Sequence, residues 1–290
     1  MNPVSVVIPA YNESGSIRSV VESVRLFMAG EKREHEVIVV DDCSSDTTAA
    51  AAQAAGAAVV THPVNRGYGA ALTTGIKKAK HDVILIMDAD GTYPIAEAKK
   101  LLPFADAFDM VVGARQGKHY HGSPMKRFSR IIFYMLLNYV TAESVPDANS
   151  GLRIFKKSVV MQFEDNFCRG FSFTTTLTLL LLANGYLVKF VPVEYHSRGG
   201  SKSKVKYARD TARTVQILMH AIISYNPIKA FLPFSLISLV LCLLFAGACC
   251  AGADRLLCGL SAVMSFFSAM LFLGLGMIAY AVVRRGIGKR

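Results

Sequence analysis

Two carboxylates that stand two residues apart are the residues of this chain best suited to chemistry. Asp88 and Asp90 follow an apolar run at residues 83–87 and precede a Gly-Thr-Tyr-Pro turn. Carboxylate oxygens are hard ligands, so this pair at the end of a buried strand suits Mg²⁺ or Mn²⁺ that carries a phosphate group. Because aspartate is also favoured in turns, a solvated acidic turn is the alternative interpretation of an isolated Asp-x-Asp. The surrounding residues must decide between the two.

The elements that would position these carboxylates alternate along the first 110 residues. Strands are predicted at residues 4–8, 36–40, 57–61 and 83–87, with helices between them at 16–28, 46–55 and 69–80. This alternation is typical of an α/β domain with a mostly parallel sheet flanked by helices, which binds ligands beyond the carboxyl ends of its strands. Three of those ends carry unusual residues, and we expect them to line one crevice: Pro9-Ala10-Tyr11-Asn12-Glu13, Asp41-Asp42 and Asp88-Ala89-Asp90.

The last sixty residues are too apolar for a soluble domain. The whole chain is 52% hydrophobic and 18% charged, with a mean hydropathy of +0.36. Residues 231–253 and 256–283 contain no charged side chain, and each exceeds the roughly 20 helical residues that cross a hydrocarbon core. We therefore predict two transmembrane helices in a tight hairpin, with Pro233 in the first turn of the first helix, where its missing N–H costs little. A hairpin buried in a soluble globule is the alternative.

The net charge of +11 is concentrated beside the predicted spans. Basic residues dominate residues 198–229 and close the chain at 284–290, so both termini are expected to face the cytoplasm. No basic run is interleaved with aromatic residues in the first 200, which favours anionic membrane lipid over nucleic acid as the partner. The predicted organisation is a cytoplasmic domain over residues 1–204, a basic juxtamembrane helix over 205–230, transmembrane helices within 231–283 and a basic tail over 284–290.

Several motifs follow one another in a familiar order. Residues 7–13 (VIPAYNE), 39–46 (VVDDCSSD) and 65–71 (NRGYGAA), followed by Asp88-Ala89-Asp90, resemble the nucleotide-sugar half of the family 2 glycosyltransferases, which have the GT-A fold. Residues 147–153 (DANSGLR), 171–175 (FSFTT) and 198–204 (RGGSKSK) resemble the polyprenyl-phosphate sugar transferases of that family, the branch of the dolichol-phosphate mannose synthases. The resemblance covers about residues 3–230, and a terminal hairpin fits those members of the branch that carry membrane helices.

The resemblance implies a pocket for the base and ribose of a nucleotide sugar. Pro9, Tyr11 and Glu13 would shape this pocket, and Asp42 would accept hydrogen bonds from the base. Arg115 ends a further predicted strand at residues 111–115 and is placed to reach a phosphate. A plain surface loop remains the alternative for Tyr11 and Glu13, as does a surface arginine for Arg115.

The resemblance also assigns roles to the acidic triplet. Asp88, with Ala89 beside it, would meet the ribose or the metal, and Asp90 would hold Mg²⁺ or Mn²⁺ on the diphosphate. The metal neutralises the nucleoside diphosphate as it leaves, which is the main electrostatic demand of the reaction. Many members of the branch have Gln or His two residues after the second Asp, whereas this chain has Thr92. The remaining metal ligands are therefore open.

A lipid phosphate is the acceptor that the resemblance implies. An alcohol would need a general base, whereas a phosphate monoester is largely dianionic at neutral pH and can attack the anomeric carbon directly, with inversion. Asp147 would orient the acceptor or act as a base, and a helix cap explains it equally well. The residues expected to act in catalysis are Asp90, Asp147, Arg198 and Lys204.

Basic residues near the membrane would bind the acceptor phosphate. The candidates are Arg127, Arg130, Arg198, Ser203 and Lys204. Members of the branch have R-x-x-G-x-S-K around the last three, but here Ser201 replaces the usual Gly, and attraction to lipid head groups is the alternative role for each cation. The basic start and apolar body of residues 123–141 predict a helix in the membrane interface, with an ordinary core helix as the alternative, and residues 204–225 suggest a second.

The expected activity is transfer of one sugar from a nucleoside diphosphate sugar, of the GDP-mannose or UDP-glucose type, to polyprenyl phosphate at a membrane. Asp88-Ala89-Asp90-Gly91-Thr92 also matches the D-x-D-G-T of haloacid-dehalogenase phosphatases, but no later acidic pair follows it at a strand end. A redox Rossmann protein lacks support because no G-x-G-x-x-G follows the first strand. A processive polysaccharide synthase would carry Q-x-x-R-W, and this chain has no Trp. A non-catalytic membrane scaffold and a homo-oligomer both remain compatible with the sequence.

Overall fold

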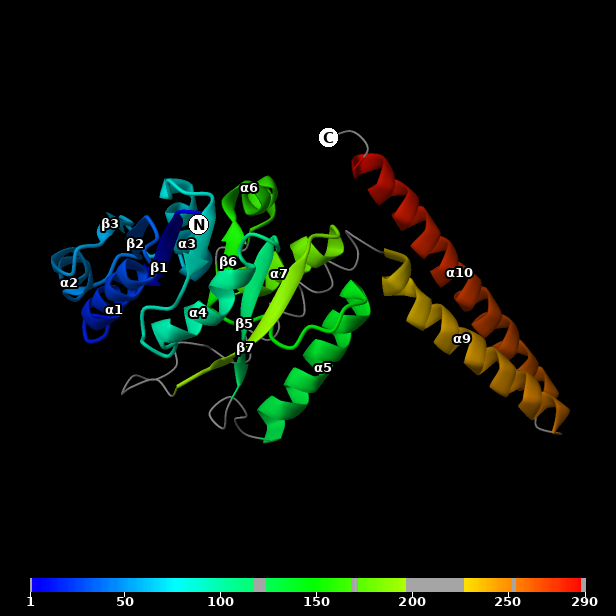
Figure 1. The fold of residues 1–290 in the computed structure, drawn as a ribbon. Helices are drawn as coiled ribbons and strands as arrows, with labels where there is room; N and C mark the ends of the chain where they lie inside the picture. The colour runs from blue at the N-terminus through cyan, green and yellow to red at the C-terminus, as the bar shows by residue number, and fades with distance from the viewer. Residues whose placement is uncertain are drawn as a thin grey trace. The chain divides into compact units, whose positions relative to one another are not determined.

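The computed structural model describes residues 2–116, 124–167, 170, 172–196, 227–251 and 254–287, without the side chains of 124–130, 132 and 284–287. Contacts divide the chain into two units, Met1–Thr214 and Val215–Arg290. The first unit holds a sheet flanked by helices, and the second holds two long helices (Figure 1). Each unit is described by itself.

The strands of the first unit form one sheet in the order β3-β2-β1-β4-β6-β5-β7. Neighbouring strands are parallel except at β6, which runs antiparallel to both β4 and β5. The predicted mostly parallel α/β sheet is therefore confirmed. The strand bounds are β1 Val4–Ala10, β2 His35–Asp41, β3 Ala58–Thr61, β4 Val83–Ile86, β5 Met110–Gln116, β6 Arg153–Lys156 and β7 Val188–Glu194.

Helices cover both faces of this sheet, which explains why the central strand β4 is apolar throughout. In β1 and β4 successive side chains alternate between two cores, so that Val6 and Leu85 lie in one core and Val7 and Ile84 in the other. The first core is completed by α1 Ile17–Gly30, α2 Thr48–Ala54 and α4 Ala98–Leu101. The second core is completed by α3 Tyr68–Lys78 and α7 Phe173–Ala183 (Figure 1).

Short helical segments connect these elements. They are η1 Ile95–Glu97, η2 Leu102–Phe104, α6 Lys157–Val160 and η4 Met161–Asn166, together with the longer α5 Pro124–Thr141. The helix predicted over residues 123–141 thus matches α5, and the strands and helices predicted in the first 110 residues lie within two or three residues of the observed bounds. The rhythm of β-branched runs and helical patterns was sufficient to place them.

The second unit consists of α9 Pro227–Cys250 and α10 Arg255–Ile287. The prediction that Pro233 lies in the first turn is wrong, because α9 begins at Pro227 and Pro233 lies inside the helix. The described part of α9 already includes residues 227–232 ahead of this proline. At Pro233 the bond from residue 233 to the carbonyl of residue 229 is absent.

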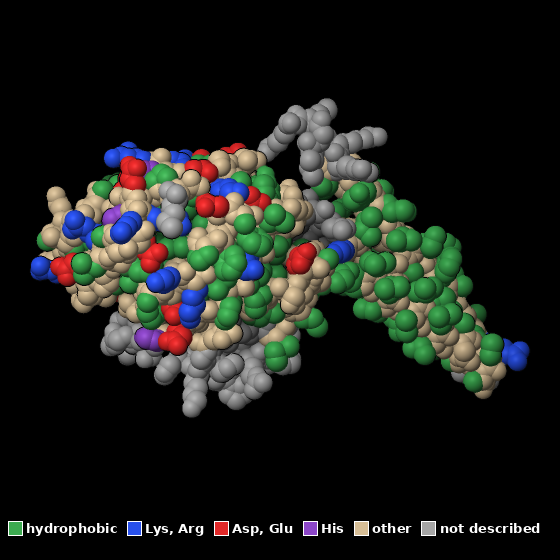
Figure 2. Space-filling view, in the orientation of Figure 1, with side chains coloured by type: hydrophobic (Ala, Val, Ile, Leu, Met, Phe, Trp, Pro, Cys, Tyr) green, Lys and Arg blue, Asp and Glu red, His purple; other side chains and the backbone are tan. Residues whose placement is uncertain are grey.

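The two long helices pack closely on each other and expose apolar side chains outward. The Ser235 hydroxyl donates to the carbonyl of Ala269 at 2.9 Å, and a Cβ at Gly276 would lie 3.3 Å from Phe231 Cβ. Residues Pro227–Cys250 and Arg255–Val283 have mean hydropathies of 2.4 and 2.2, with only 11% of each apolar window buried. Figure 2 shows hydrophobic side chains along much of this pair. Both helices are long and apolar enough to cross a membrane, which indicates a membrane protein.

Candidate functional site

The strand register brings the predicted motifs to one edge of the sheet. Ala10, the last residue of β1, pairs with Asp41 at the end of β2, and β4 ends beside β1 where Ile86 pairs with Val7. Because β6 runs the other way, it starts at this same edge, where Arg153 opposes Ile86. The loop at residues 147–152 therefore arrives next to the loops that follow β1, β2 and β4. The sheet gathers these motifs at one edge, as the sequence predicted.

The loops after β1 and β2 are joined by hydrogen bonds. The N–H of Asn12 donates to the hydroxyl of Ser44 at 2.9 Å. Tyr11 is 38% exposed and Glu13 is partly buried, so both are placed at the surface of this edge, whereas Pro9 lies buried inside β1. The pocket-forming role of these three predicted residues stays a prediction.

Asp42 is committed to internal bonds. Its side chain accepts the N–H of Arg66 at 2.8 Å and of Gly67 at 2.7 Å, and its Oδ1 lies 2.7 Å from Nδ1 of His62. His62 in turn bonds through Nε2 to the Thr74 hydroxyl at 2.9 Å. Asp42 is 3% exposed and fixes the turn that leads into α3. Its predicted contact with the base stays a prediction.

The two carboxylate oxygens of the neighbouring Asp41 differ in their hydrogen bonding. Its Oδ2 accepts the N–H of Ser44 at 3.3 Å, while Oδ1 is buried without a hydrogen-bond partner among the described residues. A buried carboxylate oxygen is costly without a hydrogen-bond donor, so this atom at the edge can accept one from a ligand. The sequence placed both aspartates at this edge but did not single out Asp41 for a ligand contact, because a pair of adjacent aspartates does not show which carboxylate is already hydrogen-bonded.

The turn at Asp90 is stabilised from within. Its Oδ1 accepts the N–H of Thr92 at 3.1 Å and the Thr92 hydroxyl at 2.7 Å. Thr92 is only 1% exposed, so the residue that replaces the usual Gln or His supports the turn from inside. The carbonyls of this turn are also anchored, since Ser16 donates its hydroxyl to Ala89 at 2.8 Å and His196 donates its N–H to Thr92 at 2.9 Å.

The Asp88 carboxylate accepts a hydrogen bond from a tyrosine and lies close to a glycine. The Tyr68 hydroxyl, from the first residue of α3, donates to Asp88 Oδ1 at 2.9 Å. Burial and the nearby Asp88 carboxylate hold the pKa of Tyr68 well above its ordinary value, so the hydroxyl keeps its proton. The backbone of Gly151 is also close, since a Cβ added there would lie 2.3 Å from Asp88 Oδ2. Tyr68 belongs to a motif that was recognised, but nothing in the sequence indicated this contact.

The donor set fits a hard divalent cation. Asp88 and Asp90 offer carboxylate oxygens, and among the described residues no group of three or more His, Cys, Asp or Glu side chains is placed to hold a metal. Mg²⁺ is commonly bound by one or two carboxylates, with substrate phosphates and water completing the octahedron. The two aspartates are therefore sufficient protein ligands for a metal that binds together with a diphosphate.

Arg115 and Asp147 form a buried ion pair. Nε and Nη2 of Arg115 donate to the two carboxylate oxygens at 2.7 and 3.0 Å, and Tyr134 Oη donates at 3.2 Å. Burial alone would raise the pKa of Asp147, which is 1% exposed, but the charge and hydrogen bonds of Arg115 hold it below its ordinary value. The guanidinium also lies over the ring of Tyr195, 5.4 Å from its centroid. Asp147 is thus ionised and well bonded, which favours an orienting role over that of a base.

The loop that carries Asp147 is fixed by the fully buried Arg153. Its Nε donates to the carbonyl of Ser150 at 2.7 Å, and Nη1 donates to the carbonyl of Thr174 at 2.9 Å and to the hydroxyl of Thr178 at 2.8 Å. Burial lowers the pKa of Arg153 to about 10, so it stays charged at neutral pH. The conspicuous arginine of the DANSGLR motif is therefore a structural anchor that the sequence alone could not distinguish from a ligand-binding one.

The residues predicted to bind the acceptor are only partly described. Arg127 and Arg130 lie in α5, but their side chains lie outside the description, as do Arg198, Ser203, Lys204 and the helix suggested over 204–225. The described part of α5 exposes Ile131, Met135 and Tyr139, four residues apart, at 58%, 61% and 40%. An exposed apolar stripe of this kind agrees with a helix at a membrane surface.

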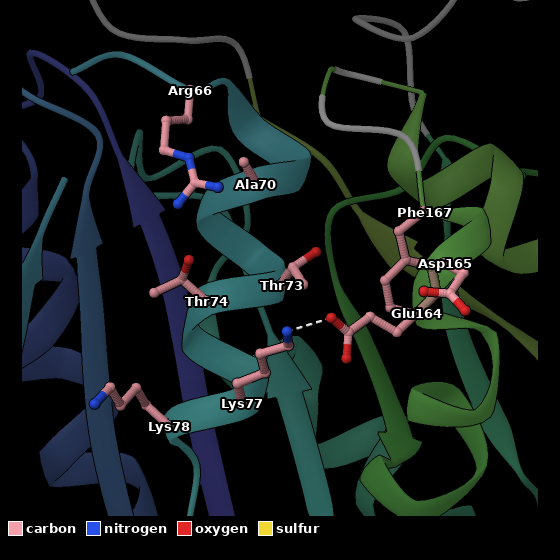
Figure 3. A pocket seen from close by; sticks show the side chains of 9 residues that line it. All are labelled: Arg66, Ala70, Thr73, Thr74, Lys77, Lys78, Glu164, Asp165 and Phe167. Carbon is pink, nitrogen blue, oxygen red and sulfur yellow. Dashed lines mark ion pairs between the residues drawn. The ribbon is translucent and has the colours of Figure 1, made fainter. Parts of the chain in front are cut away.

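A cavity of about 480 Å³ lies elsewhere, between α3 and η4. Figure 3 shows Lys77 and Glu164 pointing toward each other across it as an ion pair, with Arg66 toward one end of α3. None of the predicted site residues that the structure describes lines this cavity. The site at the strand edge is built from loops instead.

The fold is a GT-A-like α/β domain, and comparisons with known proteins give the family. Residues 5–163 match the model of glycosyl transferase family 2, which is more than half of the chain. The protein belongs to glycosyltransferase family 2. The prediction that the protein is a glycosyltransferase is therefore confirmed. The family match also excludes the phosphatase interpretation of D-x-D-G-T.

Several relatives are named as sugar transferases that act on polyprenyl phosphates. It is 28% identical to a dolichyl-phosphate hexose transferase of Haloferax volcanii over 72% of this chain and 89% of that protein. It is 29% identical to an undecaprenyl-phosphate 4-deoxy-4-formamido-L-arabinose transferase of Pseudomonas paraeruginosa over 95% of this chain and 83% of that one. It spans only 48% of another relative, the hexosyltransferase Agl6 of Haloferax volcanii.

The solved structures agree on the fold. Glucosyl-3-phosphoglycerate synthase from Mycobacterium tuberculosis, in complex with Mn²⁺, UDP and glucosyl-3-phosphoglycerate, superposes with a TM-score of 0.63 over 76% of this chain and 80% of that one. The sequences are 20% identical, so the likeness shows the fold alone. The GT-A fold predicted from the four motifs is confirmed.

Proposed function

We propose that this protein transfers a single sugar from a nucleoside diphosphate sugar to a polyprenyl phosphate at the cytoplasmic face of a membrane. One observation carries the proposal: the carboxylates of Asp88 and Asp90 share one sheet edge with a buried oxygen of Asp41 that has no hydrogen-bond partner in the described part of the chain. That combination supplies ligands for a metal diphosphate and an acceptor for a base N–H. The relatives named as polyprenyl-phosphate sugar transferases support the choice of acceptor.

On the donor side, Asp41 Oδ1 accepts an imide N–H of uracil or guanine, in keeping with a donor of the UDP-glucose or GDP-mannose type. Tyr11 and Glu13 lie at the same edge and complete the base and ribose pocket. Asp88 and Asp90 would hold Mg²⁺ or Mn²⁺, which would supply positive charge to neutralise the departing diphosphate. The chain's own contribution is to fix these carboxylates on anchored turns.

On the acceptor side, no general base is needed. A phosphate monoester is mostly dianionic at neutral pH, so its oxygen attacks the anomeric carbon while the bond from that carbon to the β-phosphate oxygen breaks. No proton has to move, and a single in-line displacement inverts the anomeric centre. Asp147 then serves to orient Arg115, which it holds by two hydrogen bonds, toward the phosphates of this edge.

The membrane organisation belongs to the same proposal. The domain over residues 1–204 would dock through α5, with Arg127, Arg130, Arg198, Ser203 and Lys204 gathering the acceptor phosphate near anionic lipid. The juxtamembrane helix at 205–230, the two spans within 231–283 and the basic tail at 284–290 would anchor it. Both termini then lie on the cytoplasmic side.

The full chain in lipid nanodiscs, supplied with polyprenyl phosphate, a divalent metal and a panel of labelled nucleotide sugars, tests the proposal. One donor should label one lipid product that carries a single sugar. Asp90→Asn should lower the rate by about 100-fold or more, because a metal ligand of the leaving group is lost. Asp106→Asn, which alters an exposed carboxylate hydrogen-bonded to Asn2, is the matched control and should leave the rate unchanged.

Other products would overturn the proposal. Oligosaccharide that grows with time would identify a processive synthase, and absence of lipid labelling with every donor would refute sugar transfer to lipid. Retention of the anomeric configuration in the product would refute the single displacement.

A further inference from the structure

We propose that Tyr68 and Gly151 are positioning residues that clamp the Asp88 carboxylate in its metal-binding orientation and thereby set the affinity for the divalent cation. The proposal rests on the metal site of the proposed function and extends it to residues that are not metal ligands themselves. Asp88, Tyr68 and Gly151 come from three different segments of the chain. Their meeting at one carboxylate is a product of the fold.

The first half of the clamp is the Tyr68 hydroxyl, which donates to Asp88 Oδ1 at 2.9 Å. Tyr68 itself cannot drift, because it opens α3 directly after Gly67, whose φ of 98° suits a glycine, and because the N–H of Gly67 is bound by the buried Asp42. The bond orients the Asp88 carboxylate. The hydrogen bond thus restricts Asp88 to one rotamer before the metal binds, so less side-chain conformational entropy is lost on binding.

The second half is the backbone at Gly151. A Cβ there would lie 2.3 Å from Asp88 Oδ2 and 2.6 Å from both Cγ and Oδ1, so the glycine lies against the face of the carboxylate. Its N–H donates to the Tyr93 hydroxyl at 2.9 Å, and that hydroxyl also lies 3.2 Å from Oγ of Ser150. Tyr93 is 2% exposed, so this turn is held from the core. Gly151 therefore acts as a fixed wall.

Both contacts restrict the orientation of the Asp88 carboxylate. Partners that orient a metal ligand typically account for 10- to 100-fold in metal affinity. Removing the Tyr68 hydroxyl should cost about tenfold, since one hydrogen bond to a charged group is lost. Adding a methyl group at Gly151 should lower the metal affinity at least as much, because the Asp88 carboxylate would have to move away from the new methyl group.

The test is a Mn²⁺ titration of the purified full chain in nanodiscs with nucleoside diphosphate, followed by the electron paramagnetic resonance of free Mn²⁺. Tyr68→Phe should raise the Mn²⁺ dissociation constant about tenfold without changing the thermal unfolding midpoint by more than a few degrees. Tyr186→Phe, which removes an exposed tyrosine hydroxyl bonded to Gln162, is the control and should bind like the unsubstituted protein.

Gly151→Ala provides a second, independent arm, with Gly30→Ala as its control because a Cβ at Gly30 meets nothing within 4 Å. Gly151→Ala should weaken Mn²⁺ binding, and combining it with Tyr68→Phe should cost less than the product of the two effects. Superimposable titrations for Tyr68→Phe and the unsubstituted protein overturn the clamp, as does the absence of Mn²⁺ binding by the unsubstituted protein. Mn²⁺ binding without sugar transfer to lipid would refute the proposed function and leave the clamp standing.

Discussion

Arg115→Met isolates the energetic role of the buried pair with Asp147. The substitution keeps an apolar stem of similar length but removes the charge and both side-chain hydrogen bonds. Removing one partner of a buried ion pair costs about 3–5 kcal/mol, because the remaining charge is left uncompensated. Since the Arg115 side chain is 18% exposed, we expect the lower end, about 3 kcal/mol.

The loss should depend on pH in a defined direction. In the unsubstituted protein burial acts to raise the pKa of Asp147, but Arg115 holds it below its ordinary value, so the pair stabilises the fold above the ordinary carboxyl pKa and loses this effect as pH falls through the lowered value. Without Arg115, burial raises the pKa of Asp147, and acidification neutralises the stranded carboxylate. The difference in stability should therefore be largest near neutral pH and shrink toward about pH 4.

Thermal unfolding in one detergent at a series of pH values measures this. A loss of about 3 kcal/mol corresponds to a fall in Tm of about 6–12 °C for a domain of this size. The double variant Arg115→Met/Asp147→Asn should recover part of the loss, because the stranded charge is gone. A Tm difference that does not vary with pH, or a double variant less stable than Arg115→Met, would refute the electrostatic explanation.

Three further outcomes follow from the geometry. Asp41→Asn should weaken nucleoside diphosphate binding about tenfold in calorimetry while leaving Tm unchanged or higher, because an amide is less costly to bury than a carboxyl group; unchanged affinity would contradict its role as the base acceptor. Arg153→Met should lower the free energy of unfolding by about 3 kcal/mol or more, because several buried carbonyl and hydroxyl groups lose their donor, and denaturant unfolding that matches the unsubstituted protein would contradict this. Met135→Asp on the exposed stripe of α5 should raise KM for long polyprenyl phosphate severalfold without altering donor affinity, since a charge opposes entry of the helix into the interface. Leu26→Asp on α1, an exposed leucine at 77%, is its control, and equal effects of the two would argue against docking through α5.

The fold was accessible from sequence because its signals are local and repeated. The run that forms β4 is apolar throughout, as a strand buried on both faces must be, and the turn residues after it mark its end. The long uncharged runs identified α9 and α10 for the same reason. The start of α9 was misplaced because the absence of charge marks the hydrophobic span, whereas the helix begins at Pro227 outside it.

The site was predictable in outline but not in its contacts. Motif order located Asp88 and Asp90, since these follow a strand end, but the bond from Tyr68 to Asp88 joins residues 20 positions apart through tertiary structure. Asp41 and Asp42 differ because the N–H groups of the turn before α3 bond to the carboxylate of Asp42, and this contact depends on tertiary structure. Arg153 and Arg115 are both arginines of recognised motifs, yet only burial shows that one anchors a loop and the other borders the edge.

The antiparallel strand β6 has a consequence for how the first unit comes apart. In the strand order, β3, β2, β1 and β4 lie on one side of β6, and β5 and β7 lie on the other, so the four residues Arg153–Lys156 are the seam between the two parts of the sheet. Fraying of this one short strand would separate Asp88 and Asp90 from Arg115 while leaving each part internally paired. The amides of β6 thus report, through their hydrogen exchange, the free energy with which the two halves of the site stay assembled.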